Sequence, residues 1–229
     1  MLTTFGPEIW TADGDEVAVA GFHYPTRMSV VRLSDGGLFI WSPIPLDNGL
    51  RDAVDGLGPV RYIVAPNSLH HLSIPAWKSA YPQAKVLAAP GLRKKRKDIA
   101  FDGDLGDRPE PDWAGDIDQV LMAGNAITTE AVFFHRKSGT VLFTDLLQQF
   151  PDGWFSGWRG WIAKLDLMVG PEPSVPRKFR VAFTSKRAAR IALKRILAWP
   201  TRKVLMAHGA PVTTDGKAFL VRAFRWLGT

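Results

Sequence analysis

The sequence contains no cysteine, and this absence excludes several kinds of chemistry at once. Without thiols the chain forms no disulfide, no thiolate nucleophile and no thiolate metal site. Any metal ion must then be held by His, Asp or Glu, a ligand set that suits Zn²⁺, Mn²⁺ or Fe²⁺. No GxGxxG follows an expected strand and no Walker-type GK[ST] is present, so the common nucleotide-binding classes are not indicated.

Long apolar runs are also missing. No stretch approaches the roughly 18 apolar residues that a membrane-spanning helix needs. The first residues, MLTTFGPEIWTADGD, lack the basic start and apolar run of a secretory signal. We therefore expect the chain to begin at the start of the fold and to be cytoplasmic.

The 229 residues are instead rich in core-forming side chains, since 46% are hydrophobic and 13 Phe and 9 Trp are present. A chain of this size and composition can bury a large core. No repeat or linker is visible, so we expect a single α/β domain over residues 1–229.

Apolar runs bounded by turn residues predict the elements of this domain. A turn at Asp13-Gly14-Asp15 follows the first apolar run, at 8–10, and residues 98–116 form an irregular segment. Helices are expected from Asn48 to about Leu57 and over 74–81, 186–199 and 216–227. Strands are expected over 28–33, 38–41, 60–65, 85–89, 117–121, 131–135, 140–144 and 204–207.

Four polar residues follow such runs at the point where a strand should end: His70, His71, Asp145 and His208. Open sheets collect ligand and catalytic groups in such loops, because the rigid sheet directs them at one crevice. Three imidazoles and one carboxylate suit a single divalent ion. Adjacent histidines reach one ion only if the loop turns sharply between them. One of the pair could therefore lie behind the ligands and orient them rather than bind the ion. On spacing alone, separate hydrogen-bonded loop residues remain the other interpretation.

The order of these segments resembles the metallo-β-lactamase superfamily and, more narrowly, its DUF4336 family of unknown function. The segments APNSLHHLSIPAWKSAYPQAKVLAAPGL, SGTVLFTDLL and VLMAHGAPV carry the resemblance, which covers nearly the whole chain. It implies a four-layered αβ/βα sandwich of two mixed sheets. It also implies a hydrolase that uses metal ions.

The superfamily's HxHxDH loop can be set on this sequence residue by residue. With His71 on the last His of the pattern, His70 stands on its Asp and Ser68 on its second His. Asn125 lies where the next ligand of the family, a His in a PGH-like turn, would be. Asp145 and His208 match the bridging carboxylate and the final His. The resemblance thus implies that the first metal site is lost and the second retained, with these ligands: His70, His71, Asp145 and His208.

Such a chain would hold one divalent ion, Zn²⁺ foremost and Mn²⁺ or Fe²⁺ otherwise, or none. We expect a metal-dependent hydrolase of a small ester, amide or phosphate substrate, with Asp145 and His208 in catalysis. The alternative is a non-catalytic binding or scaffold protein. The net charge of +7 leaves a third possibility, binding of nucleic acid or an anionic membrane through residues 93–97 and 186–195, although solvated helical faces explain both runs.

Several other residues are weaker candidates for the pocket: His23, Ser68, Asn125 and Trp154. His135 ends an apolar run and is expected to be structural. Residues 150–170 carry Trp154, Trp158 and Trp161 among glycines. They could cover a sheet edge, roof the pocket, face a partner subunit or touch a membrane beside Arg159 and Lys164.

Overall fold

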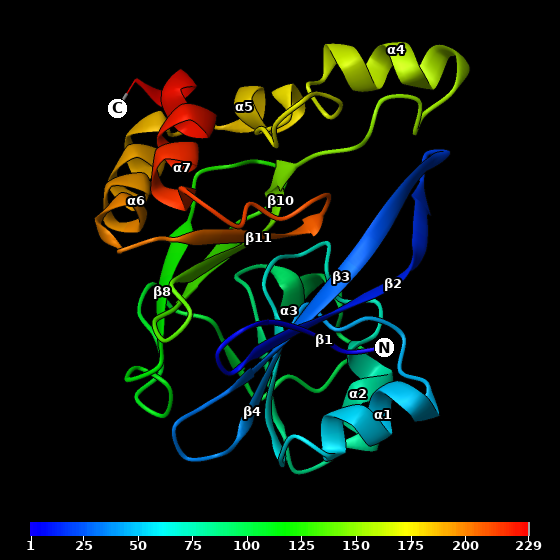
Figure 1. Cartoon of the computed structure of the whole chain (residues 1–229), viewed down its shortest axis with the longest axis vertical. Coiled ribbons are helices and arrows are strands. Elements are labelled where there is room, and N and C mark those ends of the chain that lie inside the picture. Colours follow the sequence, from blue (N-terminus) through cyan, green and yellow to red (C-terminus); the bar gives the residue numbers. More distant parts are fainter. Residues whose placement is uncertain (229) are drawn as a thin grey trace.

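Two mixed β-sheets pack face to face in the computed structural model, which describes residues 1–228 (Figure 1). The first sheet has seven strands in chain order, antiparallel from β1 to β4 and parallel from β4 onward. Its strands are β1 (Thr3–Gly6), β2 (Ile9–Val19), β3 (Phe22–Arg32), β4 (Leu38–Trp41), β5 (Val60–Ala65), β6 (Lys85–Ala88) and β7 (Gly103–Asp104).

The second sheet has four strands in the order β11-β10-β9-β8. Only the pair of β10 and β11 is parallel. The strands are β8 (Ile117–Met122), β9 (Glu130–His135), β10 (Thr140–Gln148) and β11 (Lys203–His208).

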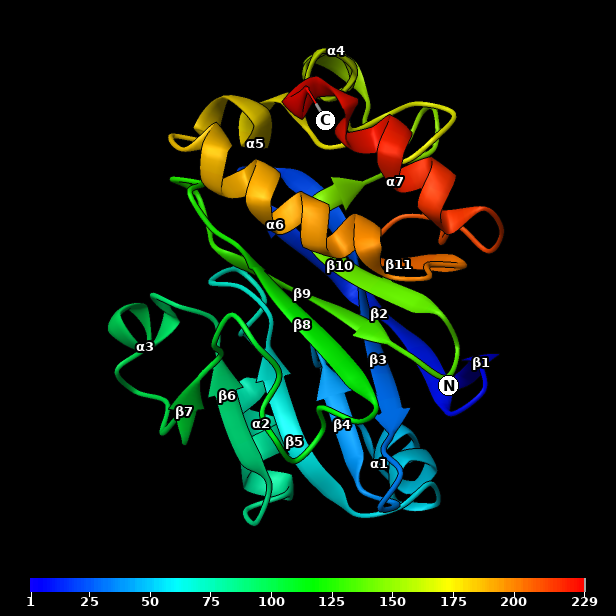
Figure 2. The same ribbon diagram turned by 90° about the vertical axis from the view of Figure 1, so that its left-hand side faces the viewer.

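Helices cover the outer faces of both sheets, which makes four layers (Figure 2). α1 (Asn48–Asp55), α2 (Ile74–Ala80) and α3 (Leu92–Lys95) lie on the first sheet, and α6 (Lys186–Ala198) and α7 (Gly216–Phe224) lie on the second. A 3-10 turn, Arg225–Leu227, follows α7. One core cluster lies between each sheet and its helices, and another fills the space between the two sheets. Phe39, Trp113 and Phe133 are among the largest members of the cluster between the sheets. The predicted four-layered αβ/βα sandwich is confirmed.

The long hairpin of β2 and β3 departs from the sequence prediction. The turn predicted at Asp13-Gly14-Asp15 is wrong, because these residues lie inside β2. The pairing of β2 with β3 shifts register after Gly14, so a β-bulge keeps this segment within the strand. The chain reverses at Ala20 and Gly21 instead, whose φ angles of 49° and 76° suit a type I′ hairpin turn. The hairpin therefore reaches past the sheet toward α4 (Figure 1).

Residues 150–182 contain two helices that the sequence does not predict, α4 (Gly157–Leu165) and α5 (Arg177–Ala182). Phe150 and Phe155 are buried in a small cluster with Ala163 and Met168. The tryptophans behave differently, since Trp158 and Trp161 are 58% and 75% exposed. The phenylalanines are thus core residues that pack on Phe22 and Tyr24 of β3, and these two tryptophans are not part of a core. Among residues 1–228, no helix combines the length and the apolar character needed to cross a membrane.

Candidate metal centre

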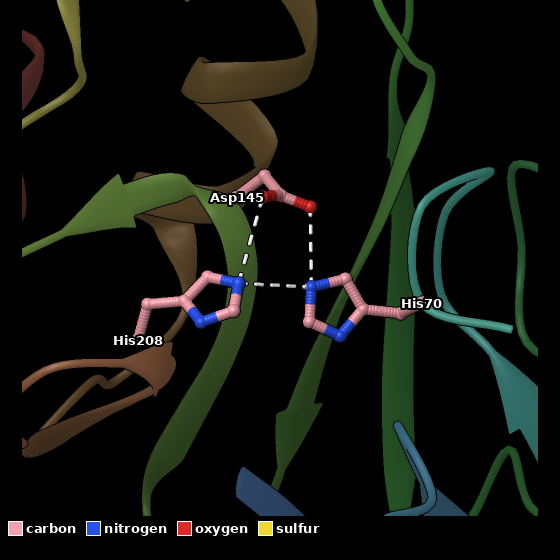
Figure 3. A group of neighbouring side chains, drawn as sticks. All are labelled: His70, Asp145 and His208. Atoms are coloured by element: carbon pink, nitrogen blue, oxygen red, sulfur yellow. Dashed lines mark hydrogen bonds and ion pairs between the residues drawn. The ribbon is translucent and has the colours of Figure 1, made fainter. Parts of the chain in front are cut away.

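Three side chains converge at one point: His70, Asp145 and His208 (Figure 3). The Nε2 atoms of His70 and His208 are 3.1 Å apart. Asp145 Oδ2 lies 3.2 Å from His70 Nε2, and Asp145 Oδ1 lies 3.6 Å from His208 Nε2. Asp145 and His208 are buried, and the His70 side chain is only 11% exposed.

Each of these residues is delivered by a strand. His70 comes from the loop after β5 of the first sheet, Asp145 lies in β10 and His208 is the last residue of β11. β10 and β11 run parallel as neighbours, and their register shifts between Phe143 and Gln148. The site is therefore built from the loop after β5, the interior of β10 and the end of β11, so strands of both sheets hold it on a rigid frame.

Asn67 fixes the loop that carries His70. Its Oδ1 accepts hydrogen bonds from the backbone N–H groups of Leu69 and His70, at 2.8 and 2.9 Å. Its Nδ2 donates to Asp145 Oδ2 at 2.6 Å and to Thr144 Oγ1 at 2.8 Å. Asn67 is fully buried. One amide thus joins two of the three converging residues, a turn-forming role for which Asn is well suited.

Hydrogen bonds on the far side of each ring orient the two imidazoles. His208 Nδ1 lies 2.7 Å from the carbonyl oxygen of Pro25, which can only accept. Nδ1 therefore carries a proton, and Nε2 is the ring nitrogen that faces His70 and Asp145. His70 Nδ1 lies 2.8 Å from Ser42 Oγ. Such partners are the usual support of metal-binding histidines.

One donor atom from each residue can be chosen so that all three lie within 4.8 Å of one another. Ligands arranged tetrahedrally at about 2.0–2.1 Å from zinc are roughly 3.3 Å apart. The two Nε2 atoms, 3.1 Å apart, are close to that value, and each lies within 3.6 Å of one oxygen of Asp145, His70 beside Oδ2 and His208 beside Oδ1. Two neutral imidazoles and one carboxylate would leave a divalent ion at a formal charge of +1. This group could hold one ion, and its ligand types do not fix which metal.

Electrostatics keep the central carboxylate ionised. Burial alone would raise the pKa of Asp145, but His70 and His208 hold it well below its ordinary value. Glu130 lies behind it, fully buried, and accepts hydrogen bonds from the backbone N–H groups of Thr144, Asp145 and Leu146. Burial and the charge of Asp145 raise the pKa of Glu130 to about 7. Glu130 therefore holds the backbone that presents Asp145.

A cavity of about 710 Å³ opens beside the three residues, and all of them line it. Its walls are mainly apolar and include Val17 and Tyr24 of the β2–β3 hairpin and Leu69 and Leu72 of the loop after β5. This volume suits a small-molecule ligand.

Comparison with known families decides where the chain belongs. The model of the DUF4336 family, described as a domain of unknown function, matches residues 7–156. The chain belongs to the DUF4336 family. A search of curated proteins finds no match.

Solved structures similar to this DUF4336 protein are metallo-β-lactamases. One from Pontibacter korlensis has a TM-score of 0.64 and 10% identity, covering 100% of this chain and 99% of its own. One from Hirschia baltica has a TM-score of 0.65 and 11% identity, covering 99% and 96%. FIM-1 from Pseudomonas aeruginosa, in its mono-zinc form, has a TM-score of 0.64 and 12% identity, covering 100% and 94%. At these identities the likeness shows the fold alone.

The DUF4336 site differs from the predicted ligand set at His71. Its Nδ1 accepts a hydrogen bond from Arg96 Nη1 at 2.7 Å, and it is not one of the converging residues. The turn made by Asn67 directs only the first of the two histidines at Asp145. Burial, together with the charges of Lys95 and Arg96, lowers the pKa of His71 to about 4. The structure thus brings together three of the four predicted ligands.

Ser68 and Asn125, two of the weaker pocket candidates, lie outside the cavity lining within the described residues. Ser68 Oγ forms a hydrogen bond of 3.0 Å with Thr128 Oγ1. Asn125 is buried, and its Nδ2 donates to the carbonyl of Phe179 at 2.8 Å. Both hold loops rather than face the cavity.

The other two weaker candidates, His23 and Trp154, share a second hollow at the tip of the hairpin. Trp154 Nε1 donates to the carbonyl of His23 at 2.9 Å. The His23 ring is 61% exposed and lies 3.4 Å from Glu16. His135, expected to be structural, is buried with Nδ1 2.9 Å from Ser138 Oγ.

The sequence gives only weak signals for Asn67, Ser42 and Pro25. Asn67 could have been suspected as an Asx-turn former directly after a strand. Ser42 and the Pro25 carbonyl meet their histidines only in the folded chain.

Proposed function

We propose that this DUF4336 protein is a metal-dependent hydrolase with a mononuclear site, acting on a small ester, amide or phosphate ester. The observation that carries the proposal is the convergence of His70, Asp145 and His208 in the wall of a large apolar cavity. When bound, a divalent ion would supply a Lewis acid and lower the pKa of a coordinated water toward neutrality.

The chain's own residues prepare such a site. The Pro25 carbonyl orients the His208 ring so that its Nε2 faces the site. Asp145 is ionised at neutral pH, and its two oxygens receive separate hydrogen bonds, from Asn67 at 2.6 Å and from Gln148 at 3.2 Å. These bonds hold the carboxylate in one orientation, so little reorganisation is needed when it acts as a ligand or orients a water.

The cavity would hold the organic part of a substrate. Ile44, Leu69, Leu72 and Ile127 line it, and apolar walls of this kind exclude water from a reacting group. His and Asp ligands suit zinc, manganese and iron, and we propose zinc foremost among these.

A hydrolysis panel tests this proposal. Purified protein loaded with Zn²⁺ or Mn²⁺ is assayed on p-nitrophenyl esters, anilides and p-nitrophenyl phosphate esters, with and without chelator. We expect turnover of at least one class, lost with chelator and in Asp145→Asn, and retained in His23→Gln, an exposed histidine away from the site. Folded, metal-loaded protein that turns over none of them would favour a non-catalytic binding protein.

A further inference from the structure

The outward face of α4 is apolar. Trp158, Trp161, Ile162 and Leu165 are spaced as i, i+3, i+4 and i+7, so they form one stripe along the helix. Their exposed fractions are 58%, 75%, 42% and 63%. Within Gly157–Leu165, all of which is described, only Ala163 is buried. A continuous stripe of this size on the surface marks an interaction site rather than scattered exposure.

This stripe lies at one end of the molecule. Figures 1 and 2 both place α4, α5 and the end of α7 at the top of the molecule, far from α1 and α2 at the bottom; Figure 1 shows α5 between α4 on one side and the end of α7 on the other. α5 adds Val181, which is 83% exposed. We call this end, formed by α4, α5 and the 3-10 turn Arg225–Leu227, the α4 end.

The charge of the chain is divided unevenly along its length. Residues 176–229 contain thirteen Lys or Arg and one acidic residue, Asp215, a formal charge of +12 in a chain whose total is +7. α5, α6 and α7 all belong to this part. Residues 1–175 carry the remaining charge of −5. The positive charge is therefore concentrated in the helices of the second sheet.

Part of this charge lies in the α4 end itself. α4 has no acidic residue and contributes Arg159 and Lys164. Arg180 lies over the ring of Trp226, 5.6 Å from its centroid, and Trp226 directly follows Arg225 in the 3-10 turn, so α5 and this turn bring their arginines near one another. Burial, followed by the charges of Arg177 and Arg225, lowers the pKa of Arg180.

Two acidic side chains between α4 and α5 are paired with basic residues, while Asp152, five residues before α4, is exposed and forms no ion pair among residues 1–228. Asp166 lies 3.5 Å from Lys178, and Glu172 lies 2.8 Å from Arg222. Among residues 1–228, no ion pair is formed by Lys164, Arg177 or Arg225. Their charges are left to attract an anionic partner.

We propose that the α4 end docks on a membrane surface that contains anionic phospholipids. α4 would lie in the plane of the interface, with its apolar stripe at the boundary between headgroups and acyl chains. Tryptophan is enriched at that depth, and the surrounding Lys and Arg would contact the lipid phosphates.

Nucleic acid fits this surface less well. Phosphates would satisfy the arginines and bases could stack on the tryptophans, but Ile162, Leu165 and Val181 would gain nothing from stacking. A second copy of the chain fits less well too, because pairing two α4 ends would bring two strongly basic segments together.

The α4 end also adjoins the cavity. Phe22 of the hairpin packs edge-on against Trp158, with ring centroids 6.1 Å apart, and Val17, Val19 and Tyr24 of the same hairpin line the cavity. Membrane contact would therefore be made next to the cavity wall, although docking itself needs no metal and no hydrolysis.

Vesicle co-sedimentation tests the proposal. The full chain, with chelator and without, is mixed with vesicles of phosphatidylcholine and with vesicles in which about a quarter of the lipid is phosphatidylserine. We expect binding to the phosphatidylserine vesicles at low salt, weakened steeply by salt and similar with and without chelator.

Two variants and one control sharpen the test. Trp161→Ser with Leu165→Ser should lower the partition coefficient about tenfold or more. Arg177→Ser with Arg225→Ser should lower it about fivefold for each charge removed. Ile191→Ser, an exposed apolar residue of α6, should change it less than about twofold. Thermal melting checks that each variant is folded.

Three outcomes would overturn the proposal. One is no co-sedimentation of the wild type at low salt. Another is unchanged binding by the folded Trp161→Ser, Leu165→Ser variant. The third is a wild-type dimer, measured by light scattering, that dissociates in that same variant. Because chelator is not expected to affect docking, a negative result here is distinct from a negative result in the hydrolysis panel.

Discussion

Asn67→Ala tests whether the residues that support the metal site matter, because it leaves all three ligands in place. Asn67 is not one of the converging residues, yet its amide joins the His70 loop to Asp145. Alanine keeps the strand end and removes all four hydrogen bonds of the side chain. The metal ligands themselves remain in the chain.

The structure sets the size of the effect. A neutral hydrogen bond contributes about 0.5–1.5 kcal/mol net, and one to a charged group about 1.5–3 kcal/mol. Asn67 makes three neutral bonds, to Thr144 Oγ1 and two backbone N–H groups, and one to the Asp145 carboxylate. Asn67→Ala should lower the free energy of unfolding by about 3–7 kcal/mol and weaken metal binding by about 10–100-fold.

Urea unfolding of metal-free protein measures the first quantity, and competition with a fluorescent chelator measures the second. Thr144→Val is the matched control, because it removes only one neutral bond of Asn67. It should cost about 1 kcal/mol and leave metal affinity within about threefold. If Asn67→Ala bound metal as tightly as the wild type, Asn67 would not position the site, and the reasoning would fail.

Three further predictions follow from backbone and burial. Gly209→Ala places a Cβ 2.3 Å from the Gln149 carbonyl oxygen at a φ of +116°, so it should cost more than about 2 kcal/mol in urea unfolding and weaken metal binding. Burial lowers the pKa of His135 from 6.5 to about 4, so the unfolded chain binds a proton that the folded chain does not. The free energy of unfolding should therefore fall by about 3 kcal/mol as the pH drops from about 6.5 to about 4. Urea midpoints measured across this pH range report the loss, and His135→Asn should abolish the share that His135 contributes. Glu130→Gln sets an amide N–H₂ against backbone donors and should cost about 2–4 kcal/mol by thermal unfolding, while a stable variant would show that the carboxylate is not needed behind Asp145.

The elements that the sequence predicts well are those whose apolar residues face the core. The run 60–65 becomes β5 with the same bounds, because it is buried and flanked by Gly58-Pro59 and Pro66. α4 could not be predicted in this way, since its apolar residues face outward and Gly157 and Gly160 interrupt it. The turn expected at Asp13-Gly14-Asp15 failed because a bulge lets glycine remain inside a strand.

The site could be predicted only in part for a similar reason. His208 ends an apolar run, His70 lies in the loop that follows one, and Asp145 interrupts one, and each of these is a local signal. The direction of His71 depends on the turn that Asn67 makes and on Arg96, which lies 25 residues further along the chain. The partner of His208, the Pro25 carbonyl, is 183 residues away in the sequence. Contacts of that kind are set by tertiary packing and have no local pattern.

The most direct test of a mononuclear site is the metal content of protein purified without chelator. Elemental analysis should find close to one divalent ion per chain in the wild type. His208→Ala and Asp145→Asn should reduce it to near zero, and His71→Ala should keep most of it, since His71 lies outside the converging group. Two ions per chain, equal loss in His71→Ala, or metal-free protein whose melting temperature does not move with added Zn²⁺ or Mn²⁺ would contradict the account.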